Sequence, residues 1–191
     1  MEFNNNLKVI NMLGGPGCRK STTALLVAGL MKAKGLNAEY VHEYPKDLIF
    51  ENRPDMFVEQ DYIFAQQNKR LRRLAKSGVE WAITDTSLLL SLFYRSENFY
   101  DYQSFDMFVR SVYDTYININ IYLTRPETYV VFGRNETEKQ ARQIDKNIVD
   151  FLNKNNVPYF CFDSSEPLKT AEKITTIITN AGWCNSCTYG S

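Results

Sequence analysis

The chain has 191 residues, of which 44% are hydrophobic, and this is enough to bury the core of one globular domain. Its 22 basic and 22 acidic residues balance, so no overall charge draws the protein onto nucleic acid or membrane, although a local basic face would suffice for nucleic acid. The N-terminal segment is acidic and polar and no long apolar run follows, so we expect a cytoplasmic protein without signal peptide or membrane span.

The first predicted elements are a buried strand over residues 7–13, a glycine-rich loop, and a helix over 21–34 that Gly35 ends. This order is the P-loop arrangement, in which backbone N–H groups and the helix N-terminus bind phosphates. Lys20 reaches the β- and γ-phosphates of ATP, and the Ser21 hydroxyl binds Mg²⁺. The predicted nucleotide-binding residues of the loop are Gly14, Gly15, Pro16, Gly17, Cys18, Arg19, Lys20, Ser21 and Thr22.

Arg19 departs from this pattern, because it stands where GxxxxGK[ST] has its second glycine. We expect Arg19 to keep a negative φ, since its Cβ is tolerated in the loop only in that conformation. Cys18 in the loop and Cys161 in a later strand are expected to be reduced thiols.

The remaining elements continue the alternation of strands and helices. Residues 43–47 form a proline-containing turn, and the alternating polar residues of 117–123 predict a strand nearer one edge of the sheet. Asn135 caps the next helix with Glu138 three residues on. The other expected strands are 38–42, 81–84 and 157–162, and the other helices are 55–76, 88–94, 102–116 and 167–180.

This order predicts an α/β fold of the P-loop NTPase type, with three layers and a central five-stranded parallel sheet. We expect a single domain over 1–182 and a polar tail over 183–191. Cys184 and Cys187 in the tail form one CxxC, which is too few ligands for a zinc site. We interpret the pair as incidental, with a redox pair as the alternative.

Charged residues follow three of the predicted strands. Glu43 and Asp85 end the second and third strands, where a carboxylate facing a triphosphate holds Mg²⁺ or accepts the proton of an attacking hydroxyl. We favour Asp85 as base and Mg²⁺ ligand and Glu43 as the grip on the acceptor hydroxyl, with exchanged roles as the alternative. The alternative, purely structural interpretation is that both acidic residues cap the helices that follow them.

Arginines dominate the segment after the fourth strand. Arg125 and Arg142 are predicted to bind the nucleotide, and Arg134 to neutralise charge during transfer, on a lid over about 125–142. The helix over 55–76 offers Gln66 and Arg70 as acceptor-binding residues, beside Tyr44, Phe50 and Tyr62 as stacking partners for a base. Its basic residues 69–76 are otherwise interpreted as a solvated charged face.

The stretches GGPGCRKSTT, VHEYPKD, FVEQDYIFAQQNKRLRRL, ITDTSLLLS and GRNETEKQARQID resemble small P-loop kinases encoded by bacteriophages. These kinases are related to nicotinamide riboside kinases and, more remotely, to thymidylate and deoxynucleoside kinases. The resemblance spans about residues 7–165 and implies an ATP- and Mg²⁺-dependent kinase acting on a nucleoside-like hydroxyl. In that family Glu43-Tyr44 corresponds to the acceptor side, and the strand-two acid serves as base in related kinases.

One group of the phage relatives phosphorylates 5-hydroxymethyluracil within DNA, and this modified base is our leading expectation for the acceptor. A soluble nucleoside, nucleotide or nicotinamide riboside is the first alternative. An ATP-binding switch that has no small acceptor is the second.

Overall fold

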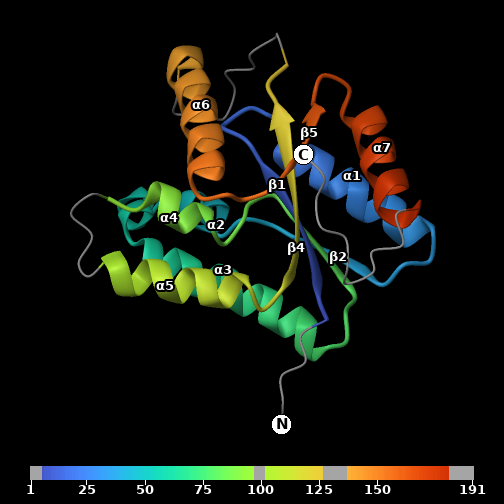
Figure 1. Cartoon of the computed structure of the whole chain (residues 1–191), viewed down its shortest axis with the longest axis horizontal. Helices are drawn as coiled ribbons and strands as arrows, with labels where there is room; N and C mark the ends of the chain where they lie inside the picture. The colour runs from blue at the N-terminus through green and yellow to red at the C-terminus, as the bar shows by residue number, and fades with distance from the viewer. Residues whose placement is uncertain (1–5, 97–101, 127–136, 181–191) are drawn as a thin grey trace. The chain divides into compact units, whose positions relative to one another are not determined.

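The computed structural model describes residues 6–96, 102–126 and 137–180. Five parallel strands form one sheet in the order β2-β3-β1-β4-β5, surrounded by helices, which confirms the predicted α/β fold (Figure 1). The strands are β1 (Lys8–Leu13), β2 (Ala38–Val41), β3 (Trp81–Thr84), β4 (Ile117–Thr124) and β5 (Phe160–Asp163). The helices are α1 (Lys20–Ala33), α2 (Pro45–Phe50), η1 (Pro54–Val58), α3 (Gln60–Lys76), α4 (Leu90–Tyr94), α5 (Tyr102–Tyr113), α6 (Glu138–Lys154) and α7 (Pro167–Asn180).

The chain divides into two compact units, and the division passes through β1 and β4. The first unit comprises residues 1–11 and 37–119. In it β3 pairs in parallel with the start of β1 and with β2, so that Thr84 is the partner of both Asn11 and Val41. The ends of β2 and β3 therefore coincide, and the segments that follow both strands begin at the same edge. Helix α3 packs against β2 and α4, and α4 packs against α5.

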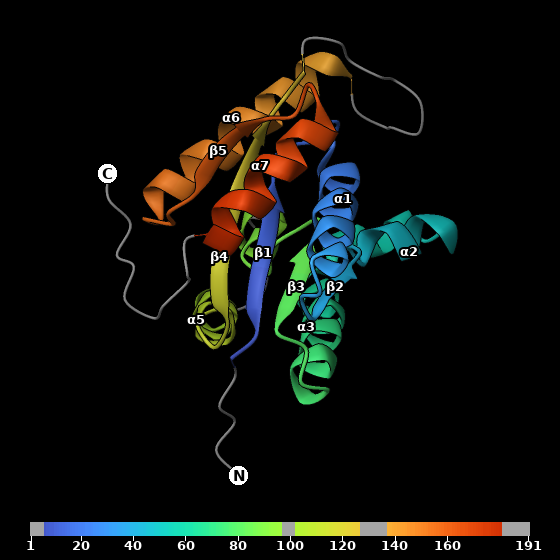
Figure 2. The same cartoon turned by 90° about the vertical axis from the view of Figure 1, so that its right-hand side faces the viewer.

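The second unit comprises residues 12–36 and 120–191. Helices α1 and α7 pack side by side in it (Figure 2). Strands β4 and β5 pair in parallel, with Thr124 opposite Asp163. The loop 14–19 leaves the end of β1 in this unit, directly before α1.

Strand β4 lies beside the edge strand β5, and its alternating polar residues Asn118 and Asn120 are half-buried and buried, respectively. Asn120 is buried and donates a hydrogen bond to the carbonyl oxygen of Pro158. Asn118 accepts a hydrogen bond from Asn11 and donates to the carbonyl oxygens of Tyr113 and Tyr116. Hydrogen bonds within the protein, mostly to backbone carbonyl oxygens, thus engage both amides, and the alternation that usually marks one solvated face has a different cause here.

Three local expectations were wrong. The proline-containing turn at 43–47 is the start of α2, because Pro45 occupies the first helical turn, where its missing N–H costs nothing. The single helix expected over 55–76 is instead η1 followed by α3, with a break at Glu59, whose ψ is 70°. Helix α6 is capped by Thr137 with Gln140 in a reciprocal capping box, whereas Asn135 lies outside the described residues.

None of the described helices is long and apolar enough to cross a membrane.

Candidate active site

The glycine-rich loop contains a left-handed residue where the pattern has glycine. Arg19 has φ 53° and ψ 27°, so the expectation of a negative φ was wrong. The Arg19 guanidinium donates hydrogen bonds to the carbonyl oxygens of Ser164, at 3.4 Å, and Ser165, at 2.6 Å, between β5 and α7. A left-handed arginine costs about 1–2 kcal/mol, and hydrogen bonds from a charged donor are of a size to offset that cost. The loop therefore keeps the backbone conformation of a glycine at position 19.

The carboxylate of Asp145 contacts the loop at Gly15 and Cys18, and no local sequence pattern identifies this residue. Asp145, on α6, accepts a hydrogen bond from the Gly15 N–H at 2.8 Å and forms an ion pair with Arg125 Nε at 2.7 Å. Its Oδ1 also accepts the Cys18 thiol at 3.4 Å. A Cβ on Gly15 would lie 2.3 Å from that same Oδ1, so glycine is needed here for close approach rather than for an unusual φ. No sequence signal links Asp145 to a loop 130 residues earlier.

Cys18 is buried and unpaired by any disulfide. Burial, together with the negative charge of Asp145, raises the pKa of the Cys18 thiol to about 11. The thiol is consequently protonated at neutral pH and is a structural part of the loop.

The first turn of α1 is electrostatically suited to an anion. Lys20 begins the helix, its Nζ donates to the carbonyl oxygen of Gly15 at 2.9 Å, and the first turn contains no acidic residue. Ser21 and Thr22 follow in that same turn. Backbone N–H groups at a helix N-terminus and an adjacent ammonium group are the donor set that a phosphate chain requires. The donor groups of the loop and of the first turn of α1 therefore fit the phosphates of a nucleoside triphosphate.

The predicted nucleotide-binding arginines lie in different surroundings. The Arg125 side chain is only 5% exposed and is paired with Asp145. Arg142 is exposed and pairs with Glu138 one turn earlier on α6, at 2.7 Å. Arg134 lies outside the described residues, as do most of the expected lid and the tail with Cys184 and Cys187. Residues 137–142 of that lid are the capped start of α6.

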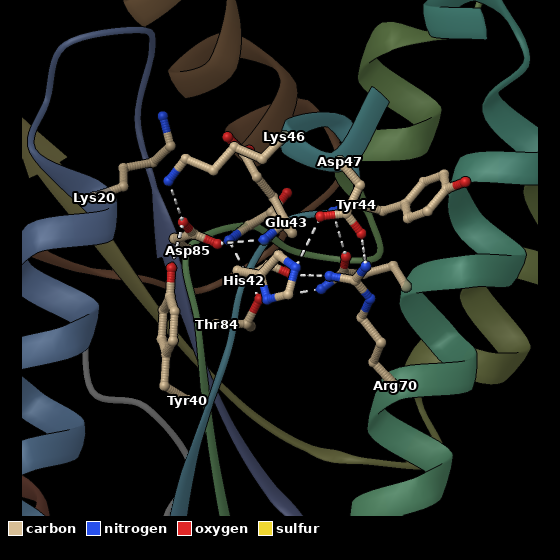
Figure 3. A network of polar contacts seen from close by, with 12 residues as sticks. Lys20, Tyr40, His42, Glu43, Tyr44, Lys46, Asp47, Arg70, Thr84 and Asp85 are labelled. Atoms are coloured by element: carbon tan, nitrogen blue, oxygen red, sulfur yellow. Dashed lines mark hydrogen bonds and ion pairs between the residues drawn. The ribbon is translucent and has the colours of Figure 1, made fainter. Parts of the chain in front are cut away.

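In the first unit, backbone groups of three successive residues after β2 are held by side chains from other elements, and Figure 3 labels two of these side chains, Arg70 and Asp85. The carbonyl oxygen of His42 accepts Arg70 at 2.8 Å, the N–H of Glu43 donates to Asp85 Oδ1 at 2.7 Å, and the N–H of Tyr44 donates to Gln67 Oε1 at 3.0 Å. The backbone that presents the Glu43 side chain is thus fixed from three directions.

Asp85 is completely buried. Besides the Glu43 N–H, its carboxylate accepts the Tyr40 hydroxyl at 2.9 Å and lies 3.6 Å from Lys46 Nζ. Asp85 follows β3 directly, so a short, rigid side chain joins the ends of β2 and β3 with the start of α2.

Gln67 and Arg70 approach the same segment from α3. Gln67 is buried and its amide also donates to Thr84 Oγ1 at 3.4 Å. Arg70 pairs with Asp47 and lies over the Tyr44 ring, 5.3 Å from its centroid. Burial acts to raise the pKa of Asp47, but hydrogen bonds from Arg70 and His42 outweigh it and lower that pKa below its ordinary value.

The residues predicted to bind the acceptor are therefore distributed unevenly. Arg70 and Tyr44 belong to this network. Gln66 is half-buried, and it is its neighbour Gln67 that contacts the Tyr44 backbone. The Tyr44 ring meets Tyr62 edge-on at 5.6 Å, and its hydrogen bond with the Tyr62 hydroxyl, followed by burial, raises the Tyr44 pKa to about 12. Phe50 is 83% exposed at the end of α2.

No group of three or more His, Cys, Asp or Glu side chains suited to a metal ion occurs among residues 6–96, 102–126 and 137–180.

Comparison with known proteins places these features in a family. The family model described as AAA domain matches residues 9–166. No curated protein sequence matches the chain. The solved structure of NadR protein in complex with NR is similar, with a TM-score of 0.68 and 12% identity over 98% of this chain and 55% of NadR.

NadR in complex with NAD and AMP-PNP gives a TM-score of 0.65 at 12% identity, with 98% of this chain and 53% of NadR covered. The chain spans about half the length of these NadR chains. Thymidylate kinase from Ehrlichia chaffeensis has a TM-score of 0.60 and 12% identity, over 92% of this chain and 99% of the kinase. At this identity the likeness establishes the fold alone.

Proposed function

The chain belongs to the AAA-domain family, and from that premise we propose that it is an ATP-dependent phosphotransferase whose acceptor is a hydroxyl of a nucleoside-like molecule. The observation that carries the proposal is the fixed backbone around Glu43, where Arg70, Asp85 and Gln67 each hold a backbone group of one of three successive residues. A motor or a simple switch needs no carboxylate presented so rigidly, whereas proton abstraction requires one. The similar fold of a thymidylate kinase supports the same class.

On the donor side, the loop 14–19 and the start of α1 bind the phosphates of ATP. The Lys20 ammonium and the backbone N–H groups neutralise the charge on the transferred phosphoryl group. Mg²⁺, for which Ser21 would supply a hydroxyl oxygen, would further neutralise phosphate charge when bound. Arg134 and Arg142 complete the charge neutralisation in this proposal, and Arg125 acts indirectly through its ion pair with Asp145.

On the acceptor side, we assign the base to Glu43 in preference to Asp85. Both oxygens of the Asp85 carboxylate already accept hydrogen bonds from protein donors, so Asp85 is better suited to orienting Glu43. In the transfer, the acceptor oxygen forms a bond to the γ-phosphorus while the bond from that phosphorus to the β,γ-bridging oxygen breaks. The acceptor proton passes to Glu43, and ADP leaves.

Comparing Glu43→Gln with Asp85→Asn at saturating ATP separates the two roles. Loss of the base lowers turnover about 10²–10⁴-fold, and we expect this for Glu43→Gln. Asp85→Asn should mainly raise the KM of the acceptor, because it loosens the backbone that orients Glu43. The opposite pattern would return the base to Asp85.

For the acceptor itself, we propose 5-hydroxymethyluracil within DNA, with a free nucleoside, a nucleotide or nicotinamide riboside as the alternative. The alternative is supported by the similar NadR structure, in which that protein is in complex with NR. The test is transfer from γ-labelled ATP to hydroxymethyluracil DNA, unmodified DNA, nucleosides and nicotinamide riboside, with Lys20→Ala as the control. Hydrolysis of ATP without transfer to any acceptor would refute the phosphotransferase proposal and favour the switch.

A further inference from the structure

One face of α3 carries four basic residues that the proposed reaction does not use. Lys69, Arg72, Arg73 and Lys76 are all exposed, and we call them the α3 stripe. Their spacing of three and four residues places them along one side of the helix, over a rise of about 10 Å. Arg70, on the same helix, turns instead toward Asp47 and is not part of the stripe.

The stripe is not balanced by acidic neighbours. Among the described residues, no ion pair within 4.0 Å joins any of its four members to a carboxylate. The whole chain has no formal net charge, so this concentration of positive charge is a local feature.

Such an arrangement weakens the helix that carries it. Lys69 with Arg73, and Arg72 with Lys76, are like charges at i,i+4, and each such pair destabilises a helix. The negative end of the helix dipole stabilises Arg73 and Lys76, which are in the last turn. It does not compensate Lys69 and Arg72, which lie further from the C-terminus. An external anion that contacts all four side chains removes the repulsion.

The chemistry of the stripe favours the phosphate backbone of a nucleic acid over a membrane. Helices that bind at a membrane surface expose an apolar face that enters the lipid. On α3 the large apolar residues Ile63, Phe64 and Leu71 are buried, and none of the large exposed hydrophobic residues in the described part of the chain lies on this helix. Two of the four cations are arginines, which bind phosphate oxygens in bidentate fashion. A rise of about 10 Å matches about three successive nucleotides of one strand.

We propose that the α3 stripe is a nucleic-acid-binding surface that holds the sugar–phosphate backbone of a polymeric substrate. This proposal depends on the proposed function in one respect: it takes the bound polymer to be the molecule that carries the acceptor hydroxyl. Binding itself requires neither ATP nor transfer, so it can be measured separately.

The binding test uses fluorescence anisotropy of a labelled DNA of about 20 nucleotides, single-stranded or duplex, between about 50 and 200 mM salt. If all four cations contact phosphates of the duplex, log Kd changes with log salt with a slope of magnitude about 3–4, or on the order of 100-fold over this range. The variant Lys69→Gln/Arg72→Gln/Arg73→Gln/Lys76→Gln should lose most of this affinity and most of the slope.

A matched control changes the same amount of charge elsewhere. Lys32 on α1, Lys34 directly after α1, Lys154 on α6 and Lys173 on α7 are all exposed. Replacing these four by glutamine lowers the net charge equally, from 0 to −4. We expect this control variant to bind DNA within a few-fold of the wild type. The stripe variant should have a thermal midpoint equal to or above the wild-type value, because like-charge pairs have been removed.

The kinase assay separates this proposal from the proposed function. The stripe variant should raise the KM for a hydroxymethyluracil oligonucleotide and leave transfer to a free nucleoside unchanged. DNA binding that depends on the α3 stripe, without phosphoryl transfer to any acceptor, would refute the proposed kinase activity but support the nucleic-acid-binding surface. Equal DNA binding by the stripe variant and the control variant would refute the proposed nucleic-acid-binding surface. Stripe-dependent binding to vesicles of anionic lipid, without binding to DNA, would also refute it.

Discussion

The contact between Gly15 and Asp145 makes a sharp prediction for a single added methyl group. In Gly15→Ala the new Cβ lies 2.3 Å from Asp145 Oδ1 and 3.2 Å from the carbonyl oxygen of Ala141. The carboxylate must move by about 1 Å to reach ordinary van der Waals distance, which breaks its hydrogen bond with the Gly15 N–H and disturbs the pair with Arg125. A hydrogen bond to a charged group contributes about 1.5–3 kcal/mol, so we expect a destabilisation of about 2–3 kcal/mol.

Denaturant unfolding measures this free energy, and the corresponding drop in Tm is about 5–10 °C for a domain of this size. Gly29→Ala is the matched control, because nothing lies within 4 Å of a Cβ at that exposed position of α1. That variant should be more stable than the wild type by about 0.5–1 kcal/mol.

A double-mutant cycle with Asp145→Ala identifies the cause. Asp145→Ala alone removes the ion-pair partner of the buried Arg125 and should cost about 3–5 kcal/mol. With the carboxylate absent, adding Gly15→Ala should cost little more, giving a coupling of about 2 kcal/mol between the two sites. Equal stability of the Gly15→Ala and Gly29→Ala variants, or simple additivity in the cycle, would refute a stabilising contact between Gly15 and Asp145.

Three further outcomes are expected for the loop and the β2 network. Arg19→Gly should be more stable in unfolding experiments than Arg19→Ala by about 1 kcal/mol, since alanine keeps the left-handed strain but loses the hydrogen bonds to Ser164 and Ser165. With the other three cysteines replaced by serine, alkylation of Cys18 at pH 8 should be about 100-fold slower than that of a free thiol and should accelerate as the pH approaches 11. Because the pKa of Asp47 is lowered in the folded protein, its stabilisation is present above the unfolded-state pKa and is lost as the pH falls through the folded value. The stability gap between the wild type and Asp47→Asn should therefore narrow in acid unfolding experiments below about pH 4.

Local patterns predicted most of the fold, and long-range contacts explain what they missed. The strand Trp81–Thr84 and the helix Pro167–Asn180 have the predicted bounds, because each has an apolar pattern and clear end signals. The P-loop was recognisable because its chemistry requires consecutive residues. Asp145 and Gln67 were missed because nothing near them in the sequence identifies their partners, which lie 130 and 23 residues away.

The conformation of Arg19 affects how such a loop is recognised from sequence. A residue pattern that demands glycine at position 19 would reject this chain, although the backbone there has the φ of 53° that glycine readily adopts. The arginine also does what glycine cannot, since its side chain ties the loop to the segment between β5 and α7. The loop is therefore better defined by its backbone torsion angles than by its amino-acid sequence. Other chains with a long cationic side chain at this position, and two carbonyl groups within its reach after the last strand, are candidates for the same loop.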